Sequence, residues 1–237
     1  MKYVGSKNRL SKYIIPIIQS KITGETNAYI EPFCGGCNII DKIRCRNRYA
    51  SDSNKYLISL LKVVRDNPDI IPQTITEEIY NNVRLNKDNY DDWYVGLVGL
   101  CSTYGAKWFG GYARGYKNDG KTKRDIPSEA IRNLKKQSVN LNGIKFKCQD
   151  YLSIPTDISG NVVYCDPPYK GTTGYKDGIN YNQFYEWVRK LSRNNIVLIS
   201  EYNMPSDFRC IWEYKHETTL DTKKHKERIE RLWVYNG

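Results

Sequence analysis

Histidine is scarce in this chain: only His216 and His225 occur among its 237 residues. Structural zinc sites are built from closely spaced cysteine and histidine pairs. Cys34 and Cys37 form one Cys-x-x-Cys pair, but neither a second pair nor a histidine stands at the spacing that would complete a site. We therefore expect no bound metal.

Long apolar runs and paired cysteines are also lacking. The seven cysteines are scattered and odd in number, which is atypical of a secreted disulfide framework. No stretch of about 18 apolar residues could span a membrane, and no signal peptide opens the chain. The sequence predicts reduced thiols, no membrane partner and a cytoplasmic location.

Positive charge is abundant. Lysine and arginine number 37 against 26 acidic residues, a formal charge of +11 with a pI near 9.2. Such an excess favours a polyanionic partner, of which nucleic acid is the commonest. A merely basic soluble protein remains the alternative.

Hydrophobic periodicity predicts an α/β fold of strands alternating with helices. In the first part we expect helices over residues 10–22, 38–43 and 56–64, and strands over 27–33 and 48–54. In the last part we expect a strand ending at residues 161–169, a helix over 182–191, a strand over 195–203 and an antiparallel pair over 208–216 and 228–236. Residues 1–66 and 148–237 would form one Rossmann-like domain with helices on both faces of its sheet. Residues 67–147, which break the alternation, would form a mainly helical insertion.

A glycine pair follows the first predicted strand, in the segment Glu31-Pro32-Phe33-Cys34-Gly35-Gly36. Ligands bind outside the carboxyl ends of strands in open α/β sheets, where glycine allows close approach to the backbone. Asp52 ends the next predicted strand, sixteen residues beyond Gly36. A carboxylate there suits the ribose hydroxyls of an adenosine-containing cofactor, although it could instead cap the following helix.

The segment Asp166-Pro167-Pro168-Tyr169 is the most informative in the chain. Proline holds the preceding residue in an extended conformation, which fixes a carboxylate, a backbone carbonyl and an aromatic ring close together. This trio suits an amino group on a flat ring: Asp166 and the Pro167 carbonyl would accept its two N–H protons while Tyr169 stacks on the ring. A simple proline-stiffened turn is the structural alternative.

These motifs occur in an order that resembles the DNA adenine N6-methyltransferases of the Dam type (α-group), whose target-recognition domain is inserted before the catalytic motif. The similarity runs through Tyr-Val-Gly-Ser-Lys at residues 3–7, the Glu31–Gly36 segment, Asp52 and Asp166–Tyr169. Residues 107–114 and 200–205 look like segments of phage-encoded members. The sequence departs from many relatives in having Tyr3 for tryptophan and Ser6 for glycine.

The resemblance implies the sheet of a class I S-adenosylmethionine-dependent methyltransferase, acting on a specific site in double-stranded DNA. It also implies a bacterial or phage-encoded enzyme, which acts either alone or beside a separate cognate restriction endonuclease. The residues that would contact the cofactor by this resemblance are Tyr3, Lys7, Glu31, Phe33, Gly35, Asp52, Asp150 and Asp166.

A paired base is out of reach of such a pocket, so the target adenine would be extruded from the duplex. Tyr169 would then stack on one face of the base. Tyr175, Tyr181 and Phe184 are candidates for the other face, although Phe184 stands at a spacing more typical of a helix core.

The insertion carries the expected DNA contacts. Residues 105–150 hold 11 basic against 4 acidic residues, interleaved with Trp108, Phe109, Tyr112 and Tyr116. This mixture favours a groove along a phosphate backbone. Arg114 is the candidate for reading guanine, and the expected phosphate contacts are Lys107, Lys121, Lys123 and Arg124, with the roles exchangeable.

Three other interpretations stay open. Methylation of cytosine N4 or of RNA would use the same pocket, although this motif is less typical of cytosine enzymes. A catalytically silent DNA-binding protein would keep the fold, but the intact Lys7, Asp52 and Asp166 disfavour it. A metal-dependent nuclease would need a carboxylate cluster, which does not accompany Asp166 in the sequence.

Overall fold

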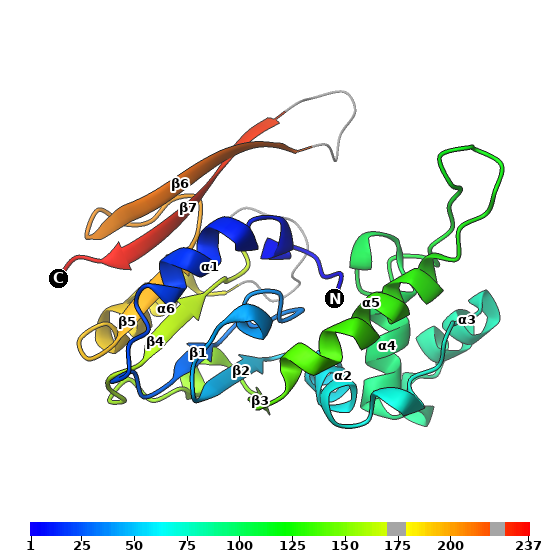
Figure 1. Cartoon of the computed structure of the whole chain (residues 1–237), viewed down its shortest axis with the longest axis horizontal. Helices are drawn as coiled ribbons and strands as arrows, with labels where there is room; N and C mark the ends of the chain where they lie inside the picture. Colours follow the sequence, from blue (N-terminus) through cyan, green and yellow to red (C-terminus); the bar gives the residue numbers. More distant parts are fainter. Residues whose placement is uncertain (170–178, 219–225) are drawn as a thin grey trace.

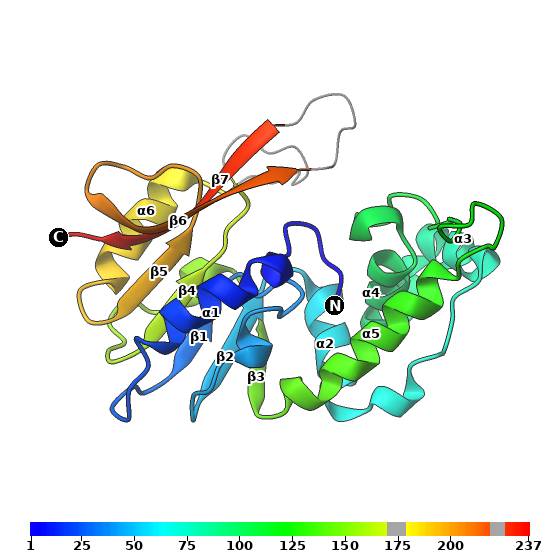
Figure 2. The same cartoon turned by 45° about the horizontal axis from the view of Figure 1, so that its top comes forward.

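A seven-stranded sheet forms the centre of the protein. The computed structural model describes residues 1–169, 179–218 and 226–237, and its strands lie in the order β3-β2-β1-β4-β5-β7-β6. The first five are parallel, whereas β7 runs antiparallel to both neighbours. The strands are β1 (Tyr29–Glu31), β2 (Arg48–Asp52), β3 (Ile144–Cys148), β4 (Val162–Cys165), β5 (Ile196–Ser200), β6 (Phe208–Thr218) and β7 (Lys226–Tyr235). Figure 2 shows the parallel strands side by side.

Helices cover the sheet on both faces. The helices are α1 (Ser11–Gln19), α2 (Lys55–Asp66), α3 (Glu77–Leu85), α4 (Asp92–Cys101), α5 (Ile126–Leu141) and α6 (Tyr181–Leu191). Successive β4 side chains point to opposite faces, as in any strand: Val162 and Tyr164 join the core beneath α1, while Val163 and Cys165 join the core beneath α6 (Figure 1). The predicted Rossmann-like α/β class is confirmed.

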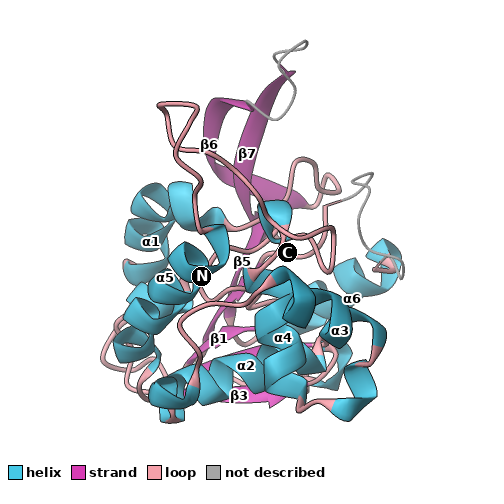
Figure 3. Cartoon of the chain, turned by 90° about the vertical axis from the view of Figure 1, so that its right-hand side faces the viewer, coloured by secondary structure: helices cyan, strands magenta, loops and turns pink. Residues whose placement is uncertain are grey.

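The chain order reverses at β1. From β1 the chain passes outward through β2 and β3, then returns to form β4 on the other side of β1. Connections on either side of such a point leave in opposite directions, so the carboxyl ends of β1 and β4 form the usual ligand site of an open α/β sheet. The antiparallel pair β6 and β7 rises beyond this edge (Figure 3).

The helices α3, α4 and α5 gather at one end of the molecule, beside α2 (Figure 1). Both α4 and α5 pack on α2, and α4 approaches it closely at Gly96. A methyl group on Gly96 would lie 2.3 Å from the Tyr56 carbonyl oxygen. The expected helical insertion is thus packed on the sheet domain, and the chain rejoins the sheet at Ile144, within the range 67–147.

One predicted helix is wrong. Residues 38–43 form only a 3₁₀ turn, η2 (Ile40–Lys42), because the backbone on either side is not helical. Cys37 lies in the left-handed region at φ +56°, and Ile43 is extended. The helices α3 and α5 and the strand β3 had no individually predicted counterparts. Within the described ranges, no helix is long and apolar enough to cross a membrane.

The contact at Gly96 yields a stability prediction. We expect Gly96→Ala to lower the free energy of unfolding by about 1–3 kcal/mol, since overpacking against backbone outweighs the gain in helix propensity of at most about 1 kcal/mol. Urea unfolding followed by circular dichroism measures the change. Gly24→Ala is the control, because a methyl group there meets no atom within 4 Å. An unchanged or higher stability for Gly96→Ala would contradict the proposed close packing.

Candidate active site

Carboxylates line the carboxyl ends of three adjacent strands. Glu31 ends β1, Asp52 ends β2, and Asp166 follows β4. Because β1 lies between β2 and β4, the sheet brings these acids, far apart in sequence, to one edge. The edge coincides with the point where the chain order reverses.

The loop after β1 fits a nucleoside cofactor. Gly35 is left-handed at φ +45°, and its N–H donates to Asp52 Oδ2 over 3.2 Å. Asn54 N–H donates to the other oxygen over 3.0 Å, whereas Asn54 itself caps α2. Asp52 is therefore not the helix cap, and each carboxylate oxygen retains a lone pair for a ribose hydroxyl. Burial raises the pKa of Asp52, although these two N–H groups oppose the rise.

Tyr3 lies against this loop. A side chain at position 35 would come within 3.0 Å of the Tyr3 ring, so the absence of a Cβ at Gly35 is what allows the ring to pack there. The resemblance predicted both residues at the cofactor, and the fold brings them into contact.

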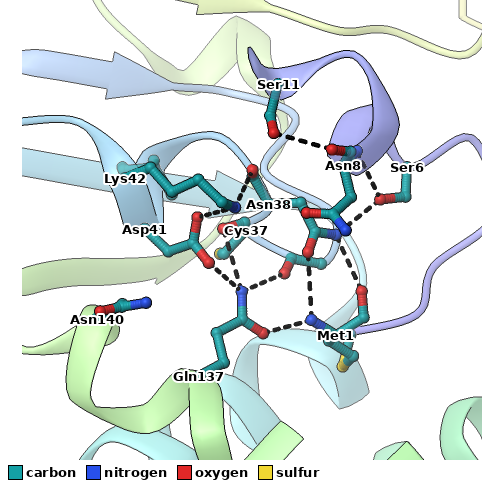
Figure 4. Close-up of polar contacts among 12 residues, drawn as sticks. Met1, Ser6, Asn8, Ser11, Cys37, Asn38, Asp41, Lys42, Gln137 and Asn140 are labelled. Atoms are coloured by element: carbon teal, nitrogen blue, oxygen red, sulfur yellow. Dashed lines mark hydrogen bonds and ion pairs between the residues drawn. The ribbon is translucent and has the colours of Figure 1, made fainter. Parts of the chain in front are cut away.

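The loop is held from behind by the buried Gln137 of α5 (Figure 4). Its Nε2 donates to the carbonyls of Gly36 and Cys37, over 3.1 and 3.2 Å, and to Asp41 Oδ2 over 2.8 Å. Its Oε1 accepts from the Met1 amino group over 2.5 Å. A helix of the insertion therefore fixes the backbone of the glycine loop, a contact that sequence motifs did not indicate.

Lys7 lies beside Asp166 rather than at the glycine loop. It belongs to the 3₁₀ turn η1 (Lys7–Arg9), is only 8% exposed, and places Nζ 2.9 Å from Asp166 Oδ1. The same Nζ is 3.4 Å from Glu230 Oε1 of β7 and 4.3 Å from the centre of the Tyr169 ring. One ammonium group thus serves the half-buried carboxylate of Asp166, the buried carboxylate of Glu230 and an aromatic face.

Glu230 completes this cluster and was not among the predicted site residues. It is 4% exposed and accepts a hydrogen bond from the Tyr169 hydroxyl. A signal was present: strand alternation puts Glu230 on the same face as Leu232, which is fully buried. An acid on the apolar face of a strand indicates a buried ionic partner.

Burial sets the protonation of the cluster. It raises the pKa of Asp166 to about 6, with Lys7 opposing the rise and Glu230 adding to it. Burial disfavours the charge of Lys7, but Asp166 and Glu230 outweigh this and raise the pKa of Lys7 above its ordinary value. Burial also raises the pKa of Tyr169, so its hydroxyl stays protonated as a donor.

The remaining predicted cofactor residues differ in their surroundings. Glu31 is 3% exposed, and its Oε1 accepts from the Tyr29 hydroxyl over 2.6 Å. Phe33 is half-buried between Tyr151 and Phe184, with ring centres 5.2 and 5.8 Å away. Asp150 is exposed and caps the turn at Leu152 through Oδ1.

The candidate stacking residues separate clearly. Phe184 is fully buried in the core beneath α6, which confirms its predicted helix-core character. Tyr181 reaches the Asp166–Tyr169 segment and donates to the Pro168 carbonyl. Tyr202, which we did not predict, packs edge-to-face on Tyr169 with ring centres 4.5 Å apart. Tyr175 lies outside the described residues.

Lys121 and Lys123 lie on a surface hairpin, residues 116–123, which the Tyr116–Lys123 bridge closes, and Arg114 and Arg124 flank it in the sequence. Lys107, Lys121 and Lys123 are exposed. Arg114 and Arg124 are also exposed but form ion pairs with Glu77 and Glu129. Exposed pairs contribute little stability, so both arginines can exchange these partners for phosphate or base.

The aromatic residues of the insertion differ from expectation. Phe109 and Tyr112 pack on the buried Tyr80, and Trp108 stacks on Tyr56 with ring centres 5.2 Å apart. Of the four, Tyr116 is 57% exposed and Trp108 37%. Phe109 and Tyr112 therefore help to build the insertion, whereas Trp108 joins it to α2. Across the residues with described positions, no group of histidine, cysteine and acidic side chains could hold a metal ion.

Comparison with known proteins finds a match to the family model of D12 class N6 adenine-specific DNA methyltransferase over residues 3–194. Type II methyltransferase M.FokI of Planomicrobium okeanokoites is 25% identical over 215 residues, covering 80% of this chain and 31% of that protein. Modification methylase StsI of Streptococcus sanguinis is 25% identical over 204 residues, covering 75% of this chain and 30% of that protein. This chain thus spans under a third of both relatives.

Among solved structures, the rRNA methyltransferase aviRa from Streptomyces viridochromogenes aligns with 97% of this chain and 85% of its own. The TM-score is 0.43 and the sequence identity 12%.

The buried Asp166 generates a pH-dependent stability prediction. Its pKa is about 6 in the fold, against 3.8 ordinarily, so the folded state binds this proton more tightly. The associated stability is present below pH 3.8 and is lost as the pH rises through 6. Relative to Asp166→Asn, which cannot ionise, wild type should lose about 2–3 kcal/mol of unfolding free energy over this range. Urea unfolding at half-unit pH steps measures it, and a pH-independent difference would contradict the assigned burial.

Proposed function

Because this chain belongs to the D12 class of N6 adenine-specific DNA methyltransferases, we propose that it transfers a methyl group from S-adenosylmethionine to the exocyclic N6 of adenine in a specific DNA sequence. The observation that carries the proposal is the buried carboxylate of Asp166 beside the Tyr169 ring, at the carboxyl edge of the sheet. The same edge carries the cofactor-compatible pair Gly35 and Asp52.

The cofactor residues act by binding and orientation. S-adenosylmethionine supplies an electrophilic methyl group carried on a sulfonium. Asp52 would accept the ribose hydroxyls, while the Gly35 backbone and the Tyr3 ring would shape the wall of the pocket. Phe33 and the exposed Asp150 flank this edge and would contact the adenine of the cofactor. Glu31 would contact the cofactor from the end of β1.

Asp166 and the Pro167 carbonyl prepare the target nitrogen. The lone pair of adenine N6 is delocalised into the ring, which makes the nitrogen a poor nucleophile. Two acceptors for its N–H protons draw the pair toward the incoming electrophile, and fixed geometry supplies much of the acceleration. Methylation leaves a surplus proton on N6, and a carboxylate whose pKa is about 6 can accept it.

A base within a duplex cannot reach this edge, so the target adenine is extruded at a cost of a few kcal/mol. Tyr169 would stack on the extruded base, and Pro168 keeps the segment rigid. Tyr181 supports this segment through its hydrogen bond to the Pro168 carbonyl. Opening the site requires Lys7 to yield part of its contact with the Tyr169 ring.

The insertion, residues 67–147, would recognise the DNA. The Tyr116–Lys123 hairpin rises on the same side of the molecule as the carboxyl edge of the sheet (Figure 1). Lys107, Lys121, Lys123 and Arg124 would bind phosphates, and Arg114 would read guanine through a bidentate pair. The names of M.FokI and StsI, a Type II methyltransferase and a modification methylase, favour a role in restriction–modification beside a separate endonuclease.

Substitution of Asp166 tests the reaction. We expect Asp166→Ala to reduce methyl transfer by at least about 100-fold, since the main acceptor of the amino group is lost. Incorporation of labelled methyl groups into duplex DNA, followed by mass analysis of the nucleosides, measures both rate and product. Asp157→Ala, an exposed aspartate, is the control. Product N4-methylcytosine, label in RNA alone, or DNA binding with no transfer by wild type would each reject the proposal.

Two lysines test the DNA-binding surface. We expect the double variant Lys121→Ala/Lys123→Ala to bind DNA more weakly and to reduce the slope of log Kd against log salt concentration by about 2, one per lost phosphate contact. Fluorescence anisotropy between 50 and 200 mM salt measures the slope. Lys190→Ala on α6, distant from the hairpin (Figure 1), is the control. An unchanged slope would place the DNA elsewhere.

A further inference from the structure

Glu230 is a buried charge with a specific environment. It stands on β7 opposite Tyr214 of β6, more than 60 residues beyond Asp166, and is 4% exposed. A buried carboxylate is costly unless paired and hydrogen-bonded. Glu230 obtains both: the Lys7 ammonium lies 3.4 Å away, and the Tyr169 hydroxyl donates to it.

Through these two contacts Glu230 touches Tyr169 directly and is linked to Asp166 by Lys7. Tyr169 and Asp166 are the two groups on which the proposed reaction depends. Tyr169 is the ring that would stack on the target base, and Glu230 holds it by its hydroxyl. Lys7 is the cation that neutralises Asp166, at 2.9 Å. An ammonium group has three donors, so Lys7 can serve both carboxylates at once.

We propose that Glu230 is a positioning residue for methyl transfer: it orients the Tyr169 ring and gives Lys7 a second anionic partner, which frees Asp166 to accept the target amino group. This inference rests on the proposed function and adds to it a residue outside the sequence motifs.

The physical reason is an exchange of partners. When an amino group takes an oxygen of Asp166, part of the contact between Asp166 and Lys7 must be given up. Breaking a buried ion pair outright costs several kcal/mol, because a charge is left uncompensated. With Glu230 already within ion-pair distance, Lys7 keeps a counter-charge throughout. Asp166 can then bind substrate without leaving a bare buried cation.

The charge of Glu230 also acts on Asp166 directly. Asp166 is faced by Lys7 from η1, Glu230 from β7, Glu31 from β1, Tyr164 from β4 and Tyr169 of its own segment. Burial is the main reason that the pKa of Asp166 is raised, and the negative charge of Glu230 adds to it. Removing that charge alone should therefore lower the pKa of Asp166.

The substitution Glu230→Gln tests the inference. Glutamine keeps the length and an oxygen acceptor for Tyr169 but removes the charge. We expect kcat for DNA methylation at neutral pH to fall between about 10- and 100-fold, the range for a misplaced catalytic group. The acidic limb of the plot of log kcat against pH should move to lower pH, while KM for the methyl donor stays within about twofold.

The matched control is Glu213→Gln, the same change on β6, where the side chain is exposed and pairs with Arg231 at 3.4 Å. It should leave kcat and the pH profile unchanged. A purely structural role for Glu230 would lower kcat without moving the acidic limb, and that result overturns the inference. So does a Glu230→Gln enzyme with wild-type turnover.

Tyr169→Phe provides a second route if Glu230→Gln folds poorly. It keeps the ring and removes only the hydroxyl that Glu230 holds, so we expect a several-fold loss of kcat that is not additive with Glu230→Gln. Additive losses would reject the contact. Wild type that transfers no methyl group would reject the proposed function instead. The inference is then tested by the pH dependence of unfolding. Glu230→Gln should shift that dependence, and the shift should be absent when Asp166→Asn is also present.

Discussion

A single buried ammonium group organises the site. Lys7 brings the N-terminal segment, the end of β4 and the strand β7 together, because it pairs with Asp166 and Glu230 and covers the Tyr169 ring. Two carboxylates at one cation leave the cluster with a surplus of negative charge. A sulfonium donor carries one positive charge, so this surplus suits it. Because both carboxylates lie within ion-pair distance of Lys7, loss of Lys7 would leave two carboxylates without a counter-charge.

A second constraint links the insertion to the cofactor loop. The amide nitrogen of Gln137 donates hydrogen bonds to the backbone carbonyls of Gly36 and Cys37, which follow Gly35, and to the carboxylate of Asp41. The helix that carries Gln137 begins two residues after Arg124, at the foot of the basic hairpin. Any displacement of α5 by DNA must therefore be accommodated at the glycine loop. The structure thus links the insertion to the glycine loop through α5 and one buried amide.

The sequence predicted those residues of the candidate site that belong to short motifs. Asp52, Asp166 and Gly35 each follow a strand, and a parallel sheet brings such strand ends to one edge whatever their distance along the chain. The place of Lys7 and the role of Glu230 were not predictable in this way. Both depend on how η1 and the antiparallel β7 pack across the end of β4, which no single motif encodes. The short helix at 38–43 failed for a local reason, the left-handed backbone of Cys37.

The insertion shows why composition is a weaker guide than packing. Aromatic residues among lysines indicated a stacking groove, yet three of the four pack on Tyr56 and Tyr80. The reason is that a segment of three helices must bury apolar area of its own before it can present a surface. The hairpin that remains outside carries lysines together with the exposed Tyr116, and Asp119 holds its shape by accepting hydrogen bonds from Lys121 and Thr122. Lysine binds phosphate without reading sequence, so in the proposed function Arg114 is the candidate for base recognition.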